Sequence, residues 1–152
     1  MKIVKLALVL SVFLAPAAFA KDDCSYCAKM DALKEGFSKV KPDSMNEKTI
    51  DQQNKLVDES ADLLGPVFKN TAKLKAEDWK RILPFLGIVV RYDYQNLVAD
   101  ETLPLMGKGR EIFFEELKKA EKANSLKPGD ADEIRVSFGT AEAIQERGSD
   151  ED

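Results

Sequence analysis

Apolar side chains recur every three to four residues through most of the chain, and this spacing predicts helices rather than strands. A first stripe occupies residues 26–40, and a second, over residues 50–64, follows a break at residues 41–44. A third stripe over residues 110–124 has charged residues on its opposite face. The pattern therefore predicts an all-α domain of about five helices, packed as a bundle or an irregular orthogonal array.

Turn and capping residues predict where these helices begin and end. Residues 44–47, Ser-Met-Asn-Glu, have the form of a capping box, so we expect the second helix to begin there. Gly65 is expected to end that helix, and Pro66 to open the next turn. Residues 103–109 and 125–130 are expected to be further breaks, because each is rich in glycine, proline or small polar residues.

The most apolar segment covers residues 79–92 and has few polar positions. A helix that is apolar on nearly all sides is a buried one, so we expect this segment to lie in the core. Pro84 should start a new helix or kink this one, because proline has no amide hydrogen to donate. Trp79 is expected to anchor the core rather than to bind a ligand.

The last segment, residues 130–147, allows two interpretations over part of its length. Residues 133–138 fit either a helix or a short strand, whereas residues 141–147 favour a helix. Residues 148–152 are acidic and have nothing to bury, so they are expected to form a disordered tail. The expected organisation is one helical domain over residues 21–147.

The first twenty residues have the pattern of a secretory signal peptide. Residues 1–5 carry two lysines, residues 6–15 are apolar or small, and Ala18 and Ala20 occupy the positions that a signal peptidase reads. The apolar stretch is shorter than the roughly 20 residues that a membrane span needs. We therefore expect cleavage after Ala20 and a soluble product that is periplasmic or secreted.

Charge and composition exclude several kinds of function. Without the two lysines of residues 1–20, the chain has 21 basic and 27 acidic residues, a net charge of −6 that argues against nucleic-acid binding. No later apolar run is long enough to cross a membrane. The chain has no histidine, which excludes Ser-His-Asp and Cys-His nucleophiles, histidine-ligated zinc and C-x-x-C-H haem attachment. No cofactor is predicted.

The only two cysteines, Cys24 and Cys27, are three residues apart. In an exported protein such a pair is expected to form a disulfide, although a loop this short restrains the unfolded chain by only roughly 2 kcal/mol. A redox pair is the alternative, because the start of a helix lowers the pKa of a thiol. However, redox C-x-x-C pairs usually follow a strand, which cannot precede Cys24, and Asp22 and Asp23 oppose thiolate formation.

Met30 adds a metal-binding alternative to the cysteine pair. Cys24, Cys27 and Met30 recur at a spacing of three, and soft sulfur ligands of this kind suit Cu(I). The simpler interpretation is that Met30 continues the apolar stripe of residues 26–40, since methionine is common in cores.

A second candidate site precedes the helix predicted at residue 110. Lys108, Gly109 and Arg110 combine positive charge with a free backbone at a helix start, which can hold an anion. A flexible turn with solvated charges explains the same residues more simply. Arg91 and Asp93 are two positions apart and so cannot face each other on a helix; one or both are expected to find a partner elsewhere.

Three functions remain from these observations. The leading hypothesis is an exported helical protein without catalysis, which binds a partner protein or a small ligand in the periplasm. The second is a thiol–disulfide redox protein that uses Cys24 and Cys27. The third is a soft-metal carrier that uses these cysteines with Met30.

Overall fold

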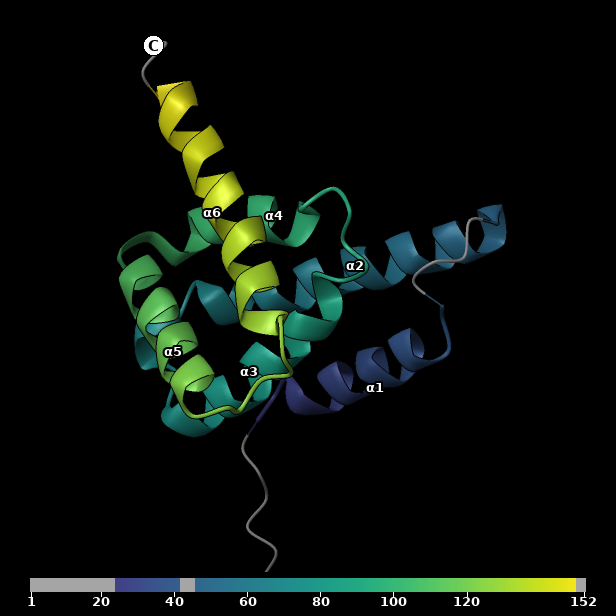
Figure 1. Cartoon of the computed structure of the whole chain (residues 1–152), viewed down its shortest axis with the longest axis horizontal. Helices are drawn as coiled ribbons and strands as arrows, with labels where there is room; N and C mark the ends of the chain where they lie inside the picture. Colours follow the sequence, from purple (N-terminus) through teal and green to yellow (C-terminus); the bar gives the residue numbers. More distant parts are fainter. Residues whose placement is uncertain (1–23, 42–45, 150–152) are drawn as a thin grey trace, which may run out of the picture.

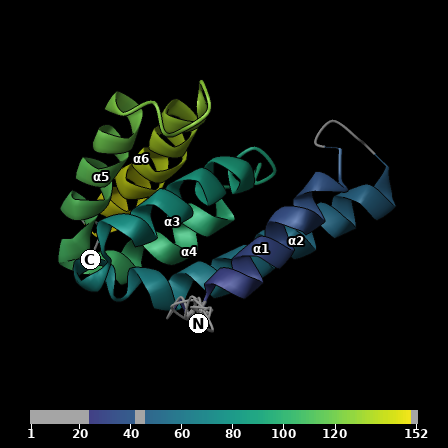
Figure 2. The same cartoon turned by 90° about the horizontal axis from the view of Figure 1, so that it is seen from below.

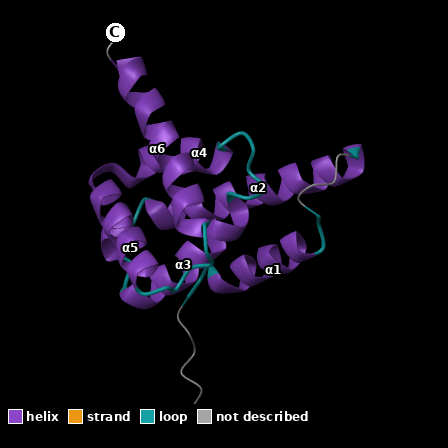
Figure 3. Ribbon diagram, viewed as in Figure 1, coloured by secondary structure: helices purple, strands orange, loops and turns teal. Residues whose placement is uncertain are grey.

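The computed structural model describes residues 24–41 and 46–149, with side chains to residue 141; the predicted signal peptide lies outside this range. Within the described residues every regular element is helical, which confirms the all-α prediction (Figure 3). In chain order the elements are α1 (Cys27–Ser38), α2 (Glu47–Phe68), the short 3-10 helix η1 (Thr71–Lys73), α3 (Ala76–Val89), α4 (Leu97–Met106), the 3-10 helix η2 (Gly107–Gly109), α5 (Arg110–Lys122) and α6 (Asp130–Ser149) (Figure 1). No helix in this part of the chain is long and apolar enough to cross a membrane.

The helices run in several directions and form an irregular array. Helix α2 packs against α1 and α4, and α3 contacts α1, α5 and α6. Figure 2 shows α1 and α2 side by side, extending together away from α5 and α6. Helix α3 therefore lies between the α1–α2 pair and the C-terminal helices, where it can present residues to both.

An aromatic cluster joins four helices in the core. Phe68 of α2 lies 6.4 Å from Trp79 of α3, 5.8 Å from Phe113 of α5 and 6.4 Å from Phe138 of α6, measured between ring centroids. All four side chains are buried, which confirms the core role expected for Trp79. Truncating an aromatic side chain in such a position costs about 3–5 kcal/mol, so this cluster supplies much of the stability of the fold.

The second helix begins within the predicted residues 44–47, but its predicted end is wrong. Helix α2 begins at Glu47, and its cap is Asn46, whose side-chain oxygen accepts the Thr49 amide hydrogen at 2.9 Å. The helix also continues through Gly65 and Pro66 to Phe68. Gly65 is buried and faces Leu105 of α4, so the glycine provides close packing between helices rather than a helix stop.

Helix α4 was not predicted, because residues 103–109 were expected to be a break. The true break is confined to Gly107–Gly109, and α4 continues through Pro104. Its buried residues Val98, Thr102 and Met106 recur at a spacing of four, the signal that the proline obscured.

Two further ambiguities are settled by the structure. Pro84 lies inside α3, which continues from Ala76 to Val89, so the proline does not start a separate helix. Residues 133–138 are helical and belong to α6, which extends to Ser149, two residues beyond the predicted end of the domain. In a strand Ile134, Val136 and Phe138 would share one face, but here Ile134 and Phe138 are buried on one side of the helix while Val136 is 68% exposed.

Candidate functional site at the disulfide

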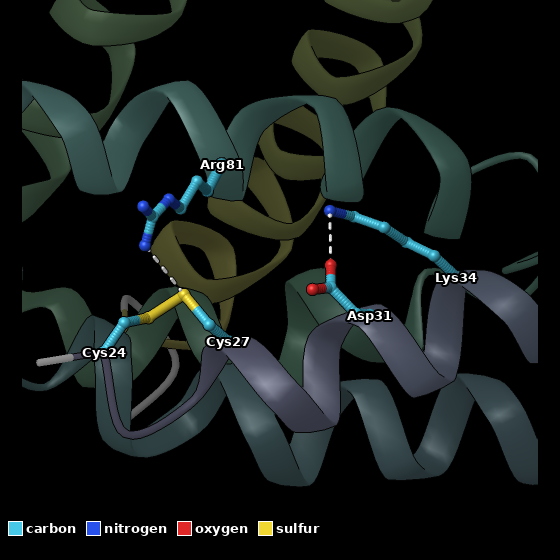
Figure 4. Close-up of polar contacts among 5 residues, drawn as sticks. All are labelled: Cys24, Cys27, Asp31, Lys34 and Arg81. Atoms are coloured by element: carbon cyan, nitrogen blue, oxygen red, sulfur yellow. Dashed lines mark hydrogen bonds and ion pairs between the residues drawn. A yellow bond between two sulfur atoms is a disulfide. The ribbon is translucent and has the colours of Figure 1, made fainter. Parts of the chain in front are cut away.

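Cys24 and Cys27 are joined by a disulfide, with their Cα atoms 5.4 Å apart. Cys27 is the first residue of α1, and Cys24 precedes the turn that enters the helix (Figure 4). The Cys27 amide donates to the Cys24 carbonyl oxygen at 3.3 Å, which closes this turn. Both residues are half-buried, so the disulfide lies at the molecular surface without being fully exposed.

Among the described residues, no side chain caps the start of α1. Tyr26 occupies the cap position but makes no capping hydrogen bond to the helix, and the first turn contains no acidic residue. By contrast, Asn46, Asp78 and Asp93 accept amide hydrogens at the starts of α2, α3 and α4. The amide groups at a helix start carry partial positive charge, which lowers the pKa of a thiol placed there. This environment would stabilise a Cys27 thiolate.

Arg81 supplies a full positive charge to the same sulfur. Its Nη1 atom lies 3.0 Å from Cys27 Sγ, within hydrogen-bond distance, across the interface between α3 and α1 (Figure 4). A nearby cation favours the thiolate form of a cysteine. The guanidinium is held beside the position where that negative charge would form on reduction.

Tyr26 and Asp78 fix the segment between the two cysteines to α3. The Tyr26 hydroxyl donates to Asp78 Oδ1 at 2.6 Å, and Asp78 Oδ2 accepts the Lys75 amide hydrogen at 2.7 Å. Burial and this hydrogen bond raise the pKa of Tyr26 above its usual value, and the same hydrogen bond lowers the pKa of Asp78. The contact holds the cysteine segment against α3 independently of the disulfide.

A small hollow of about 230 Å³ adjoins Cys27. Its other lining residues are Met30, Asp31, Lys34 and Arg81. Asp31 and Lys34 form an ion pair at 3.2 Å within α1, so the carboxylate that lines this hollow has a cationic partner (Figure 4). A reactant that reaches Cys27 through this hollow would meet two positively charged side chains.

The structure gives little support to the predicted soft-metal site. Cys24 and Cys27 are occupied by their mutual bond, and Met30 is only 1% exposed within the core. Arg81 beside Cys27 would also repel a bound cation. Among the described residues there is no group of three or more histidine, cysteine or acidic side chains that could hold a metal ion. Copper binding stays a prediction that requires the reduced pair.

The residues of the predicted anion site lie at the end of η2 and the start of α5, and Gly109 has a packing role there. A Cβ atom on Gly109 would lie 2.5 Å from Thr71 Cβ, so only glycine fits against η1. Lys108 is exposed and Arg110 half-buried, and neither lines the hollow beside Cys27. Anion binding at these residues stays a prediction.

Arg91 and Asp93 have separate partners, as the sequence predicted. Arg91 Nη1 pairs with Asp130 Oδ1 at 3.5 Å, and both Asp93 oxygens accept amide hydrogens at the start of α4. Asp130 approaches α3 at Gly87, where a Cβ atom would lie 2.4 Å from Asp130 Oδ2. These carboxylates stabilise helix contacts.

The sequence did not identify Arg81 or Asp78 as part of the site. Both lie more than fifty positions from the cysteines. Their separation of three places them on one face of α3, close enough for Asp78 to reach Tyr26 while Arg81 reaches Cys27. The sequence alone could have placed Asp78 and Arg81 on one helix face. Only the packing of α1 on α3 shows that this face contacts the cysteine segment.

Comparison with known proteins gives no further guidance, because no family model matches the chain, and neither a curated protein nor a solved structure matches it. The function must therefore be argued from the chemistry of the site.

Proposed function

We propose that this protein is exported and exchanges thiols and disulfides with a partner protein through Cys24 and Cys27. The observation that carries the proposal is the position of Arg81 Nη1, 3.0 Å from Cys27 Sγ. A cation there stabilises the thiolate of the reduced pair more than it stabilises the neutral disulfide. The reduced state becomes more favourable, and the disulfide becomes a better oxidant.

Two further features favour exchange over a purely structural role. The disulfide closes a very short loop, which restrains the unfolded chain by only roughly 2 kcal/mol. Tyr26 is already held to α3 by its hydrogen bond to Asp78. The segment is therefore anchored after reduction, and the two sulfurs would stay close enough to form the bond again.

The test is to measure the reduction potential of the pair and the pKa of the Cys27 thiol in the wild type and in Arg81→Gln. Loss of the cation should raise that pKa by about 1 unit and make the disulfide harder to reduce by roughly 30 mV. Arg135→Gln is the matched control, because Arg135 pairs with Glu121 and Asp132, away from the cysteines. A potential below about −300 mV that does not respond to Arg81→Gln would show a structural disulfide.

The second candidate is the leading hypothesis from the sequence, an exported protein that binds a partner without exchange. It is favoured by the positively charged hollow beside Cys27, which can hold a ligand whether or not the disulfide reacts. The double variant Cys24→Ser, Cys27→Ser separates the two candidates. If it retains full partner binding and full function in the cell, the exchange proposal fails and the binding proposal stands.

Export is tested by the mass of the protein recovered outside the cytoplasm. A mature chain that begins at Lys21 is expected. An uncleaved chain in the cytoplasm would contradict export and weaken both candidates.

A further inference from the structure

The hollow beside Cys27 adjoins another hollow that also lies between α1 and α3. A second hollow, of about 300 Å³, shares Lys34 with the first and continues to the loop before α6. We call the two hollows together the basic groove; its lining residues beyond those of the first hollow are Phe37, Ser38, Ile88, Arg91, Tyr92 and Lys127. Along α1 the groove runs from Cys27 to Ser38, about 16 Å at 1.5 Å per residue, the length of about five residues of extended chain.

The sign of charge in the basic groove is opposite to that of the chain as a whole. Lys34, Arg81, Arg91 and Lys127 line it. Two carboxylates face these four cations: Asp31, which pairs with Lys34, and Asp130, which pairs with Arg91 from outside the lining. The whole chain has 27 acidic and only 23 basic residues. A local excess of positive charge on an acidic protein attracts anionic partners and repels most others.

The four cations come from separate parts of the chain. Lys34 belongs to α1, Arg81 to α3, Arg91 to the turn after α3, and Lys127 to the loop before α6. Half-buried Ile88 and Tyr92 lie among them and can contact the backbone and methylene groups of a bound peptide. The groove therefore offers charged walls with an apolar surface between them.

We propose that the basic groove binds an acidic segment of the partner and that the thiols of this segment reduce the Cys24–Cys27 disulfide. The inference rests on the proposed exchange function and adds the chemical class of its substrate, an acidic dithiol peptide. The position of the disulfide at one end of the groove carries this step, because a peptide bound over Lys34 would extend to Cys27. Charge complementarity selects the acidic peptide over neutral and basic ones.

The exchange then proceeds in two balanced steps. A thiolate of the bound peptide attacks Cys27 Sγ, the sulfur that lines the groove; a peptide–Cys27 disulfide forms, the Cys24–Cys27 bond breaks, and Cys24 leaves as a thiolate that takes a proton from water. A second peptide thiolate attacks the peptide sulfur of this mixed disulfide. The peptide leaves with its own disulfide, and the electron pair moves to Cys27 Sγ beside Arg81. Two electrons pass from the peptide to the protein.

The experiment measures the rate at which three synthetic dithiol peptides reduce the mature protein. The peptides share one C-x-x-C core, flanked by glutamates, glutamines or lysines. We expect the glutamate peptide to react at least about tenfold faster than the lysine peptide at low salt, with the difference shrinking as salt is added. The double variant Lys34→Glu, Lys127→Glu should lose or reverse this preference.

The matched control is Lys55→Glu, Lys122→Glu, which makes the same change of charge at exposed positions outside the groove. It should keep the preference of the wild type. Equal rates for all three peptides, or an equal loss in the control, would overturn the acidic-substrate inference and leave the exchange function intact. If none of the peptides reduces the disulfide, the exchange function itself fails.

Discussion

The two ends of α3 both hold neighbouring helices with polar groups, but they do so in different ways. Near its start, Asp78 and Arg81 contact side chains of the cysteine segment, Tyr26 and Cys27, at a half-buried surface. Just after its end, buried Asp93 accepts the backbone amide hydrogens that begin α4. The first end therefore depends on side chains that can change partners, and the second on backbone groups that must stay paired.

The pKa values of the two carboxylates, Asp78 and Asp93, are shifted in opposite directions. The Tyr26 hydrogen bond lowers the pKa of Asp78, which favours its charged form. Burial raises the pKa of Asp93, although the amide hydrogen bonds of α4 oppose this effect. Hydrogen bonding therefore dominates the environment of Asp78, and burial dominates that of Asp93.

The largest effect is expected from Asp93→Ala, which would leave the amide groups of Leu97 and Val98 without their acceptor. Because these groups are part-buried or buried, we expect the free energy of unfolding to fall by about 2 kcal/mol in chemical denaturation. Asp100→Ala is the control, since Asp100 lies exposed in the first turn of the same helix. An equal loss in both variants would contradict the capping role of Asp93.

Tyr92→Phe should have a smaller effect at the same end of α3. The Tyr92 hydroxyl lies 3.1 Å from the carbonyl oxygens of Phe37 and Val40, and its ring packs on Phe37 at 4.8 Å. The substitution keeps the ring but removes the donor, so a loss of about 1 kcal/mol in the free energy of unfolding is expected. Tyr94→Phe, at a side chain that is 70% exposed, should change little.

At the opposite end, Tyr26→Phe should lower the free energy of unfolding by about 0.5 kcal/mol, since this contact is only part-buried. The effect should depend on pH. Because Tyr26 lowers the folded-state pKa of Asp78, the stabilisation is fully present above about pH 4 and is lost as the pH falls through that lowered pKa. Denaturation between pH 2 and 7 checks this, and a difference that widens on acidification would refute it.

The smallest effect on folding is expected from Arg81→Gln. Its contact with Cys27 Sγ is part-buried, so the free energy of unfolding of the oxidised protein should change by less than about 0.5 kcal/mol. The same variant should nevertheless shift the reduction potential of the disulfide. A large loss of stability with an unchanged reduction potential would show that Arg81 stabilises the fold and does not tune the disulfide.

The sequence predicted those features that depend on local pattern. Helical spacing identified the all-α class and the core position of Trp79, and the cysteine spacing with the expected export indicated a disulfide. Helix α4 was not predicted because Pro104 was interpreted as part of a break, although the buried residues of the helix recur at helical spacing. Arg81 and the basic groove could not be found, because they arise where helices distant in the chain pack together, and no local pattern records that contact.

The close approach of α6 to Gly87 links three positions that are far apart in the sequence. Any side chain at position 87 would occupy the place of the Asp130 carboxylate. If that carboxylate were displaced, Arg91 would lose its ion pair with Asp130. Positions 87 and 130 are therefore expected to change together in the evolution of this protein. Because Arg91 lines the basic groove, each such change would also increase the positive charge that the groove presents.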